Sequence, residues 1–596
     1  MLQAILTIHS ANNREKSKTR AKVEHVFGTW VMSMGGKLMD ISKKWPDQTV
    51  MQFRLELAFY YSWRENMKTA NPDKIKTIVI VGGGTAGWLS ALYLESKLNK
   101  LKERNCQITL IESPTIPILG IGEATIPTIV NTFKNLGISE TEFMAKCNAT
   151  FKLAIKFIDW SGVPKNNVFW HPIGQWYYTE KTDTKVLHYW LRNNLHERDK
   201  SCFSDCFETI KICENKKSPK LYDTPEFDWK LEYAYHFDAK LLANYLQEKA
   251  ISLGVRHILD DVNYVSIDHR GYIDYLELNE NGRVAGDLYI DCTGFRGLLI
   301  NQALKVPFLS FSENLLCDSA VALSVHDDPE DPYNEKIDGI APYTIARALT
   351  SGWMWTIPLV SRTSYGYVYS SSFLNESKAE FELKNVLNYN KTCDVKHLKL
   401  RVGRTKNSWE KNCISIGLSS GFIEPLESTG IYLIEAGLKH LLQYFPDKTF
   451  SETNIAIYNS LMKREYEEIR DFIVMHYCLT QREDTNFWRV NKYELKIPNS
   501  LQDKLDLWQA RWPYNSPELV GLSFPDYSYI CILAGMERYP QTSLPILEYD
   551  DTGRDKLLEI KRSAENLNQI LPNLSSYLKF KNNQFFNMSS QGVSFV

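Results

Sequence analysis

The 596-residue chain lacks an excess of charge, paired cysteines and a long apolar run. Its 69 Lys and Arg nearly balance 71 Asp and Glu, so it has no electrostatic footprint for nucleic acid or an anionic membrane. Eleven cysteines, with no C-x-x-C pair, argue against a secreted disulfide framework. The longest uncharged run, residues 77–94, is short for a membrane span and contains three consecutive glycines. The first residues lack the pattern of a secretory signal, so a cytoplasmic protein is expected.

The densest group of potential metal ligands is His196, Cys202, Cys206 and Cys213. Zinc ligands usually come in short, regular pairs, and these spacings are irregular. Ordinary thiols are therefore favoured, and no metal site is predicted.

Residues 1–72 differ from the rest of the chain, because they are basic and weakly periodic. Met67 opens a short polar lead of the kind that introduces an N-terminal strand. We interpret residues 1–66 as an appendage, or an upstream extension of the gene model, with an interaction segment as the alternative.

From residue 75 the pattern sharpens into strands and helices. Apolar runs bounded by turn residues predict strands, and apolar–polar alternation around glycine turns predicts a β-meander. The last 150 residues are mainly helical in pattern. The expected elements are strands at 78–81, 107–111, 288–291 and 412–417, helices at 88–98 and 142–159, and a meander between about 255 and 290.

A G-x-G-x-x-G motif, Gly82-Gly83-Gly84-Thr85-Ala86-Gly87, follows the first strand and opens a helix. In such a motif Gly82 permits a tight turn, Gly84 lets the backbone approach a pyrophosphate, and Gly87 lets the helix pack on the strand. Glu112 ends the next strand, where a carboxylate can accept hydrogen bonds from ribose hydroxyls. Together these features predict dinucleotide binding.

FAD is favoured over NAD by a second element far along the chain. Ile290-Asp291-Cys292-Thr293-Gly294 is a strand followed by Thr-Gly, typical of two-module FAD proteins in which the chain returns to the nucleotide module. A second glycine-rich motif for NAD(P)H is lacking. Reduced flavin would therefore have to come from elsewhere.

At these residues the chain closely resembles the flavin-dependent tryptophan halogenase family. The decisive string is W-x-W-x-I-P at 353–358, and Trp88 follows the nucleotide motif as in that family. The resemblance runs from about residue 76 into the C-terminal helices. Further matches are G-I-G-E-A-T-I-P at 120–127, F-K-L-A-I-K-F at 151–157 and P-L-E-S-T-G-I-Y at 425–432.

The resemblance implies an α/β (α+β) fold, with a Rossmann-like FAD module of the two-module monooxygenase type interleaved with a mostly helical substrate module. The modules would be an extension of unknown role at 1–72, an FAD module with inserted β-meander and substrate-covering segments at 73–440, and a mainly helical substrate-side region at 441–596. It also implies that reduced FAD, O2 and a halide generate hypohalous acid, with a separate flavin reductase as transient partner. The oligomeric state stays open, and a homo-oligomer is compatible with the resemblance.

By the same resemblance, the oxidised halogen reaches Lys152 beside a small aromatic substrate. A buried ammonium can donate a hydrogen bond to the oxidant, whereas a desolvated, neutral amine can form a haloamine, and both mechanisms stay open. Lys156 is interpreted as a solvated lysine roughly on the same face. Glu427 matches a carboxylate that orients the oxidant or takes the proton from the ring. Its bland alternative is a residue beside a helix N-cap.

The remaining family positions divide among cofactor, halide and barrier. Thr429 and Gly430 match the halide site, where free amides at a helix start can bind an anion. Trp353 and Trp355 match a barrier that keeps substrate away from the flavin, their alternative being two core aromatics. Residues 118–122 match a strap between the flavin and substrate sites. The cofactor positions are Gly82, Gly83, Gly84, Thr85, Ala86, Gly87, Glu112, Ser113, Ile121, Leu418 and Ile431.

The substrate positions depart from the family. His171 matches, but Ile173 stands where tryptophan halogenases commonly have Phe, and Phe524 where they have Trp. Residues 512–523 do not clearly reproduce the Tyr and Glu that hold the amino-acid end of tryptophan. We therefore expect an electron-rich aromatic substrate of indole, tryptophan-like or phenolic type, with the ring position and preferred halide left open.

Two other functions compete with the halogenase. An FAD monooxygenase that hydroxylates its substrate would not need Lys152 or the tryptophan pair, and usually carries Asp after the late strand glycine, where this chain has Gly417-Leu418. A flavin-binding protein without catalysis would need neither Lys152 nor Glu427.

Overall fold

The structure is a computed structural model. It describes residues 73–100, 104–118, 121–163, 167–174, 183–195, 202–327, 339–389, 394–513, 519, 523–540 and 552–590. The predicted extension at 1–72 and His196 lie outside these residues. The described residues from Ile75 onward belong to one compact unit. The three-part division of the chain stays a prediction.

Six strands form the nucleotide sheet, whose centre is β1. This strand pairs in parallel with β2 on one side and with β12, far along the chain, on the other. Both faces are apolar because α4 and α9 cover one side and the β-meander packs on the other, as is usual for parallel sheets. The four strands predicted from sequence are confirmed. In order, the sheet is β20 (Trp409–Glu410), β21 (Cys413–Ser415), β12 (Leu288–Asp291), β1 (Thr77–Val81), β2 (Gln107–Glu112) and β8 (Arg256–Leu259).

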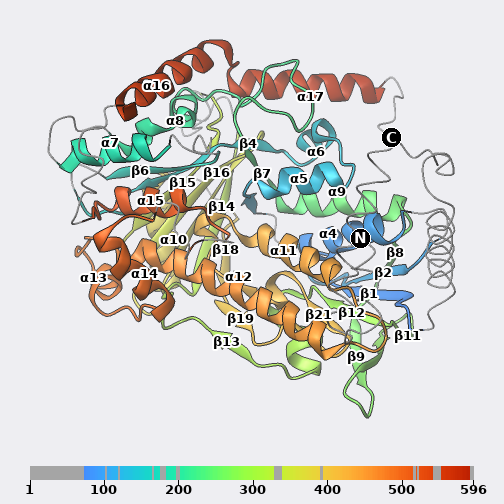
Figure 1. The fold of residues 1–596 in the computed structure, drawn as a ribbon. Helices are drawn as coiled ribbons and strands as arrows, with labels where there is room; N and C mark the ends of the chain where they lie inside the picture. Colours follow the sequence, from blue (N-terminus) through green and yellow to red (C-terminus); the bar gives the residue numbers. More distant parts are fainter. Residues whose placement is uncertain are drawn as a thin grey trace, which may run out of the picture. The chain divides into compact units, whose positions relative to one another are not determined.

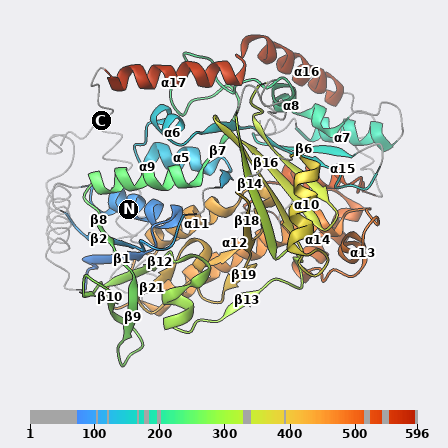
Figure 2. The same ribbon diagram turned by 180° about the vertical axis from the view of Figure 1, so that it is seen from behind.

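The second large sheet has seven strands (Figure 2). Its strands β16 and β17 are buried along their whole length, which explains their runs of aromatic and β-branched residues. In order it contains β18 (Lys396–Lys399), β14 (Ser319–His326), β17 (Arg362–Tyr369), β16 (Gly352–Pro358), β15 (Tyr343–Leu349), β5 (Ala154–Ile158) and β6 (Val168–Pro172).

Three small sheets connect the two large ones. One is the predicted meander, which is confirmed. A second positions the residues around Lys152, and the third lies beside the nucleotide sheet. They are β11 (Arg283–Val284), β10 (Ile273–Leu278) and β9 (Val262–Ile267); β3 (Gly122–Ala124), β7 (Ala234–Asp238) and β4 (Thr150–Lys152); and β13 (Phe308–Ser310), β19 (Gly403–Thr405) and β22 (Gly421–Phe422).

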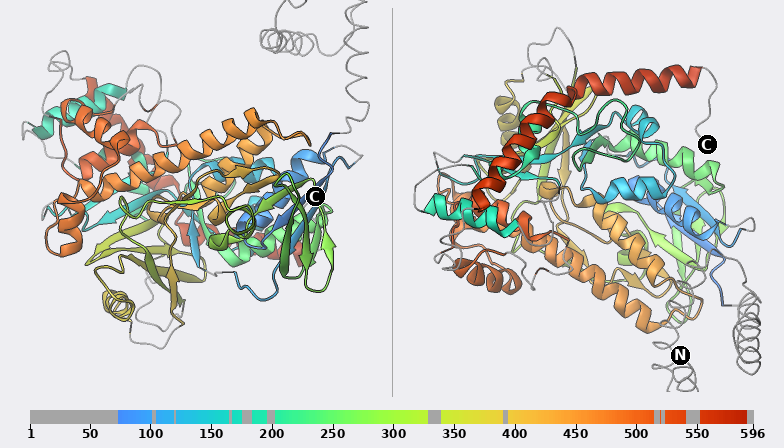
Figure 3. Two further views of the ribbon diagram at one scale, coloured as in Figure 1. Left: turned by 90° about the horizontal axis from the view of Figure 1, so that it is seen from below. Right: turned by 45° about the horizontal axis from the view of Figure 1, so that its top comes forward.

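Helices dominate the last part of the chain, as predicted. The long helix α12 crosses the molecule beside α11, and α16 and α17 run along one edge, over α7, α8 and α6 (Figures 1 and 3). The helices are α4 (Thr85–Leu98), α5 (Thr128–Asn135), α6 (Glu140–Lys146), α7 (Asp183–Leu195), α8 (Glu208–Glu214), α9 (Ala239–Ser252), α10 (Glu376–Val386), α11 (Gly430–Gln443), α12 (Glu452–Cys478), α13 (Asn486–Tyr493), α14 (Asn499–Ala510), α15 (Asp526–Gly535), α16 (Thr552–Ile570) and α17 (Leu574–Ser590). None of those searched is long and apolar enough to cross a membrane.

The helix expected at 142–159 is wrong beyond residue 146. The chain leaves α6 through Asn148, which has a φ of 53°, and then forms β4 and β5. Both strands are largely buried on both faces, so their sequence shows no two-residue alternation that would distinguish strand from helix. Lys152 and Lys156 therefore lie on two different strands rather than on one helix face.

Candidate active site

The turn from β1 into α4 requires two of its glycines by close packing. Gly82 has a φ of +118°, and a Cβ there would lie 2.3 Å from the carbonyl oxygen of Cys292. A Cβ on Gly87 would lie 1.8 Å from the Gly82 carbonyl oxygen, so the helix can start this close to the strand only with glycine. Gly84, by contrast, faces open space and precedes the first residue of α4 without a side-chain cap. The turn thus leaves free amides and room for a phosphate.

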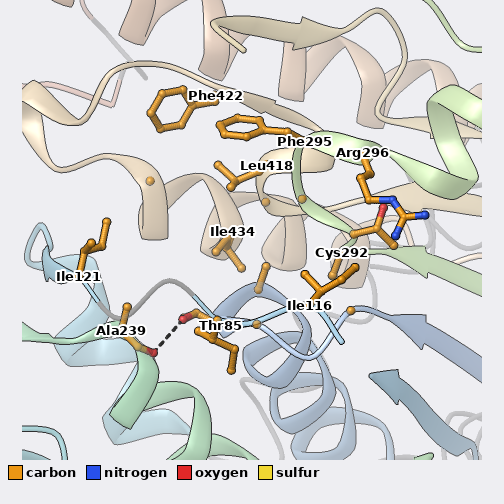
Figure 4. Close-up of a pocket in the computed structure, with 18 of the residues that line it drawn as sticks. Thr85, Ile116, Ile121, Ala239, Cys292, Phe295, Arg296, Leu418, Phe422 and Ile434 are labelled. Atoms are coloured by element: carbon orange, nitrogen blue, oxygen red, sulfur yellow. Dashed lines mark hydrogen bonds between the residues drawn. The ribbon is translucent and has the colours of Figure 1, made fainter. Parts of the chain in front are cut away.

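A cavity of about 730 Å³ extends from this turn (Figure 4). Phe295, Leu418 and Phe422 face Thr85 and Ile121 across it. Glu112 also lines it and pairs with Nε2 of His257 at 3.0 Å. Ten of the eleven predicted cofactor residues line the cavity; Gly87 instead serves packing.

The far side of the cavity depends on Asp291 at the end of β12. Its buried carboxylate accepts hydrogen bonds from the backbone N–H groups of Thr293, Leu299 and Ile300. This fixes the Thr-Gly turn, so that residues 292–296 form part of the wall. The glycine turn with its free amides, the carboxylate of Glu112 and the long apolar cavity together fit FAD.

Lys152 lies at the end of β4, and its side chain is 1% exposed. Its Nζ donates to the backbone oxygen of Thr125 at 3.0 Å and to Oγ of Ser428 at 2.8 Å. Ser428 also lines this cavity, so Lys152 is hydrogen-bonded to a residue of the cavity wall. Burial lowers the pKa of Lys152 to about 7, and the charge of Glu427 offsets only part of this effect. Two donated hydrogen bonds leave either a third N–H or a lone pair free for an oxidant.

Glu427 is held between two imidazoles and is 1% exposed. Its Oε2 lies 2.8 Å from Nδ1 of His171, and its Oε1 lies 2.9 Å from Nε2 of His476. Burial alone would raise the pKa of Glu427, but the charge of His171 and the hydrogen bonds from both rings lower it to about 2. Glu427 is therefore a carboxylate at neutral pH, and it directly precedes Ser428, to which Lys152 is hydrogen-bonded.

The segment after Glu427 turns sharply into α11. Ser428 has a left-handed φ of 62°, and Thr429 is the N-cap without a side-chain hydrogen bond to the helix. The Thr429 hydroxyl is buried and has no hydrogen-bond partner in the described part of the chain. A buried, unpaired donor beside the free amides of a helix start suits a small anion.

Trp353 and Trp355 lie on β16 and both line the cavity. Their ring centroids are 6.3 Å apart. Gly366 on β17 makes room for Trp355, since a Cβ there would lie 2.0 Å from Cζ2 of its indole. The pair thus forms a continuous aromatic wall on one side of the cavity.

Two of the predicted substrate residues are linked to Glu427: His171 is bonded to it directly, and Phe524 reaches His171 through Phe472. Nε2 of His171 lies 2.9 Å from Oγ of Ser528, and Phe524 packs on Phe472, with ring centroids 4.0 Å apart. Phe472 also contacts the His171 ring, at 6.1 Å. Ile173 is buried and donates its backbone N–H to the Leu153 oxygen at 2.7 Å. The roles of these residues stay predictions.

Sequence reasoning missed several residues around Lys152 and Glu427. Ser428 lies within the P-L-E-S-T-G-I-Y motif at 425–432, directly after Glu427, and that position indicates a residue near the site. His476 gave none, because it lies among mostly apolar residues in the last turn of α12. Glu123 lines the cavity, where desolvation raises its pKa to about 7. No group of three or more His, Cys, Asp and Glu among the described residues could hold a metal ion.

This combination of nucleotide turn, long apolar cavity and adjoining buried lysine is that of a flavin-dependent enzyme. The tryptophan halogenase family model matches residues 77–552. Tryptophan 6-halogenase ThaL from Streptomyces albogriseolus is 37% identical over 539 residues, covering 85% of this chain and 98% of the relative. The chain belongs to the tryptophan halogenase family.

Solved structures agree. Tryptophan 6-halogenase SttH from Streptomyces toxytricini has a TM-score of 0.78 at 36% identity, covering 85% of this chain and all of that one. BrvH, a flavin-dependent halogenase from Brevundimonas sp. BAL3, has a TM-score of 0.75 at 34% identity, covering 85% and 99% of the two chains. The expected α/β fold and the flavin-dependent halogenase activity are confirmed, and the hydroxylase alternative is not favoured.

Proposed function

We propose that this halogenase uses reduced FAD, O2 and a halide to halogenate a small, electron-rich, tryptophan-like aromatic at a site formed by Lys152 and Glu427. The observation that carries the proposal is the buried amino group of Lys152, hydrogen-bonded to Ser428 in the cavity wall. Bound reduced FAD would activate O2, which is the oxidant: the halide is oxidised to hypohalous acid, the flavin is oxidised to FAD, and the second oxygen atom of O2 leaves as water. A separate reductase is the proposed source of reduced FAD, since the chain carries a single nucleotide motif.

In the proposed reaction, Lys152 holds the hypohalous acid and directs its halogen at the substrate. The aromatic ring forms a carbon–halogen bond, the halogen–oxygen bond breaks, and the oxygen leaves as hydroxide, which becomes water with a proton from the protonated form of Lys152. The ring then loses the proton from the same carbon. Glu427 is an ionised carboxylate with fixed orientation, so it can accept this proton.

The whole reaction is tested by product mass. Purified protein, FAD, NADH and a separate flavin reductase are mixed in air with bromide or chloride and a panel of indoles and phenols. We expect products with a halogen isotope pattern, and no product when the reductase is left out. A gain of one oxygen instead would identify a hydroxylase, and full turnover without any reductase would refute the need for a partner.

The halide site is tested at Thr429. Replacing its hydroxyl in Thr429→Val removes a donor without changing side-chain size. We expect the KM for halide to rise roughly tenfold or more, since a hydrogen bond to a charged group contributes about 1.5–3 kcal/mol. FAD binding should change little. Thr132→Val, which removes a hydroxyl bonded to Glu435 of α11, is the matched control. Equal effects of the two variants would rule out a halide at Thr429.

Substrate preference is tested by competition. Ile173 and Phe524 are smaller than the family's usual rings, so we expect a wider pocket that accepts indole at least as well as free tryptophan. An apolar pocket discriminates weakly, by about 1–3 kcal/mol per methylene, whereas a polar clamp rejects analogues strongly. Equal concentrations of indole and tryptophan are incubated together with the protein, FAD, NADH, the flavin reductase and halide, and the two halogenated products are quantified. A preference for tryptophan of roughly tenfold, ~1.4 kcal/mol, would reveal a clamp. Ile173→Phe should improve indole binding.

A further inference from the structure

A buried carboxyl group anchors one of the two wall tryptophans. Oε2 of Glu424 accepts a hydrogen bond from the indole Nε1 of Trp353 at 2.9 Å and a second from the hydroxyl of Tyr477 at 2.6 Å. The Tyr477 hydroxyl also lies 3.5 Å from Sγ of Cys317. The network therefore joins β16, the turn before α11 and the C-terminal end of α12.

The environment of Glu424 is costly for a carboxyl group. Its side chain is fully buried, and its Oε1 has no hydrogen-bond partner within the described ranges. Burial raises the pKa of Glu424 to about 7, and the two donated hydrogen bonds only partly offset this. A buried carboxyl group of this kind contributes to the structure mainly by accepting hydrogen bonds that hold its donors, here Trp353 and Tyr477, in place.

The two wall tryptophans are held in different ways. Trp355 packs against Gly366, and its buried Nε1 has no partner in the part of the chain that the structure describes. Trp353 has the directional hydrogen bond to Glu424. Its strand lies next to β15, which contacts the strand β4 that carries Lys152. Trp353 and Ser428, the hydrogen-bond partner of Lys152, also line the same cavity, so the Trp353 ring is part of the wall that adjoins the lysine.

We propose that Glu424 is a positioning residue, whose hydrogen bond to Trp353 fixes the wall so that oxidant formed in the cavity reaches Lys152 instead of escaping. This inference rests on the proposed function and extends it to a residue that does not touch the substrate. Tyr477 is secondary: it donates to the same oxygen as Trp353, so its loss should strengthen the bond between Trp353 and Glu424 rather than break it.

The anchor is tested first in FAD-free protein by NMR, with 15N-labelled tryptophan. The indole N–H signal of Trp353 is identified by its loss in Trp353→Phe. Tyr477→Phe removes the competing donor at Oε2 and keeps the ring, so the Trp353 N–H signal should move downfield. Glu424→Gln keeps an acceptor and should preserve a hydrogen-bonded position, whereas Glu424→Leu should move the signal upfield. An unchanged signal in Tyr477→Phe would overturn the anchor even if Glu424→Leu fails to fold.

The effect on oxidant is tested by coupling, the moles of halogenated substrate per mole of reduced FAD consumed. For Glu424→Leu we expect this ratio to fall at least threefold, with the missing halogen captured by monochlorodimedone in solution. Glu424→Gln should restore most of the coupling, and Tyr477→Phe should stay near the wild type. A folded Glu424→Leu variant with wild-type coupling would overturn the proposal. If the wild type gives no halogenated product, the proposed function fails, and the NMR result stands independently.

Discussion

Replacing Lys152 by alanine is expected to abolish halogenation while the oxidation of reduced FAD by O2 continues. The lysine is bonded to Ser428 in the cavity wall and does not itself line the cavity, so we expect it to act after the oxidant has been made. Loss of a group that binds and orients a reactant at the reacting atoms costs on the order of 10³-fold or more. Lys152→Met serves as a second variant, because it fills the space left by a side chain that is 1% exposed.

The matched control for this prediction is Lys156→Ala. Lys156 is half-buried on β5, with its Nζ 5.0 Å from the centre of the Trp170 ring. It lies four residues from Lys152 but on a separate strand, and we expect most of the activity to remain. The measurements are halogenated product by mass spectrometry and FAD oxidation by absorbance. Normal halogenation by Lys152→Ala, or an equal loss in both lysine variants, would contradict the assignment.

The nucleotide module was predictable because its determinants are local. The φ of Gly82 and the contact between Gly87 and the strand are steric requirements that only glycine meets, so they leave a pattern in six consecutive residues. The strands of the nucleotide sheet are likewise marked by short apolar runs. Where burial on both faces removes the period, as in β4 and β5, the same reasoning predicted a helix that is absent.

The surroundings of the candidate site were less accessible from sequence. The partners of Lys152 are a backbone oxygen at Thr125 and a hydroxyl at Ser428, which the fold brings together from distant segments. Backbone acceptors carry no sequence signal. His476 looks like a core histidine until α12 places its Nε2 against Glu427. Family resemblance identified Lys152 and Glu427, but it did not indicate what holds either group in its charge state.

Glu427→Gln is expected to slow halogenation on the order of 10²-fold while FAD binding stays nearly unchanged. His171 and His476 hold the pKa of Glu427 at about 2. Glutamine keeps the shape and an acceptor, but it removes the negative charge that these histidines stabilise. An amide cannot take up the ring proton, and a general base typically contributes about 10²–10⁴-fold to the rate.

The matched control is Glu435→Gln on α11. Glu435 is a buried carboxyl group bonded to Thr128, and burial raises its pKa to about 7. That change should leave halogenation largely intact. Rates under single-turnover conditions and FAD affinity are measured for both variants. If Glu427→Gln loses FAD affinity in proportion to rate, Glu427 is a structural residue beside the N-terminus of α11 and the proton goes elsewhere.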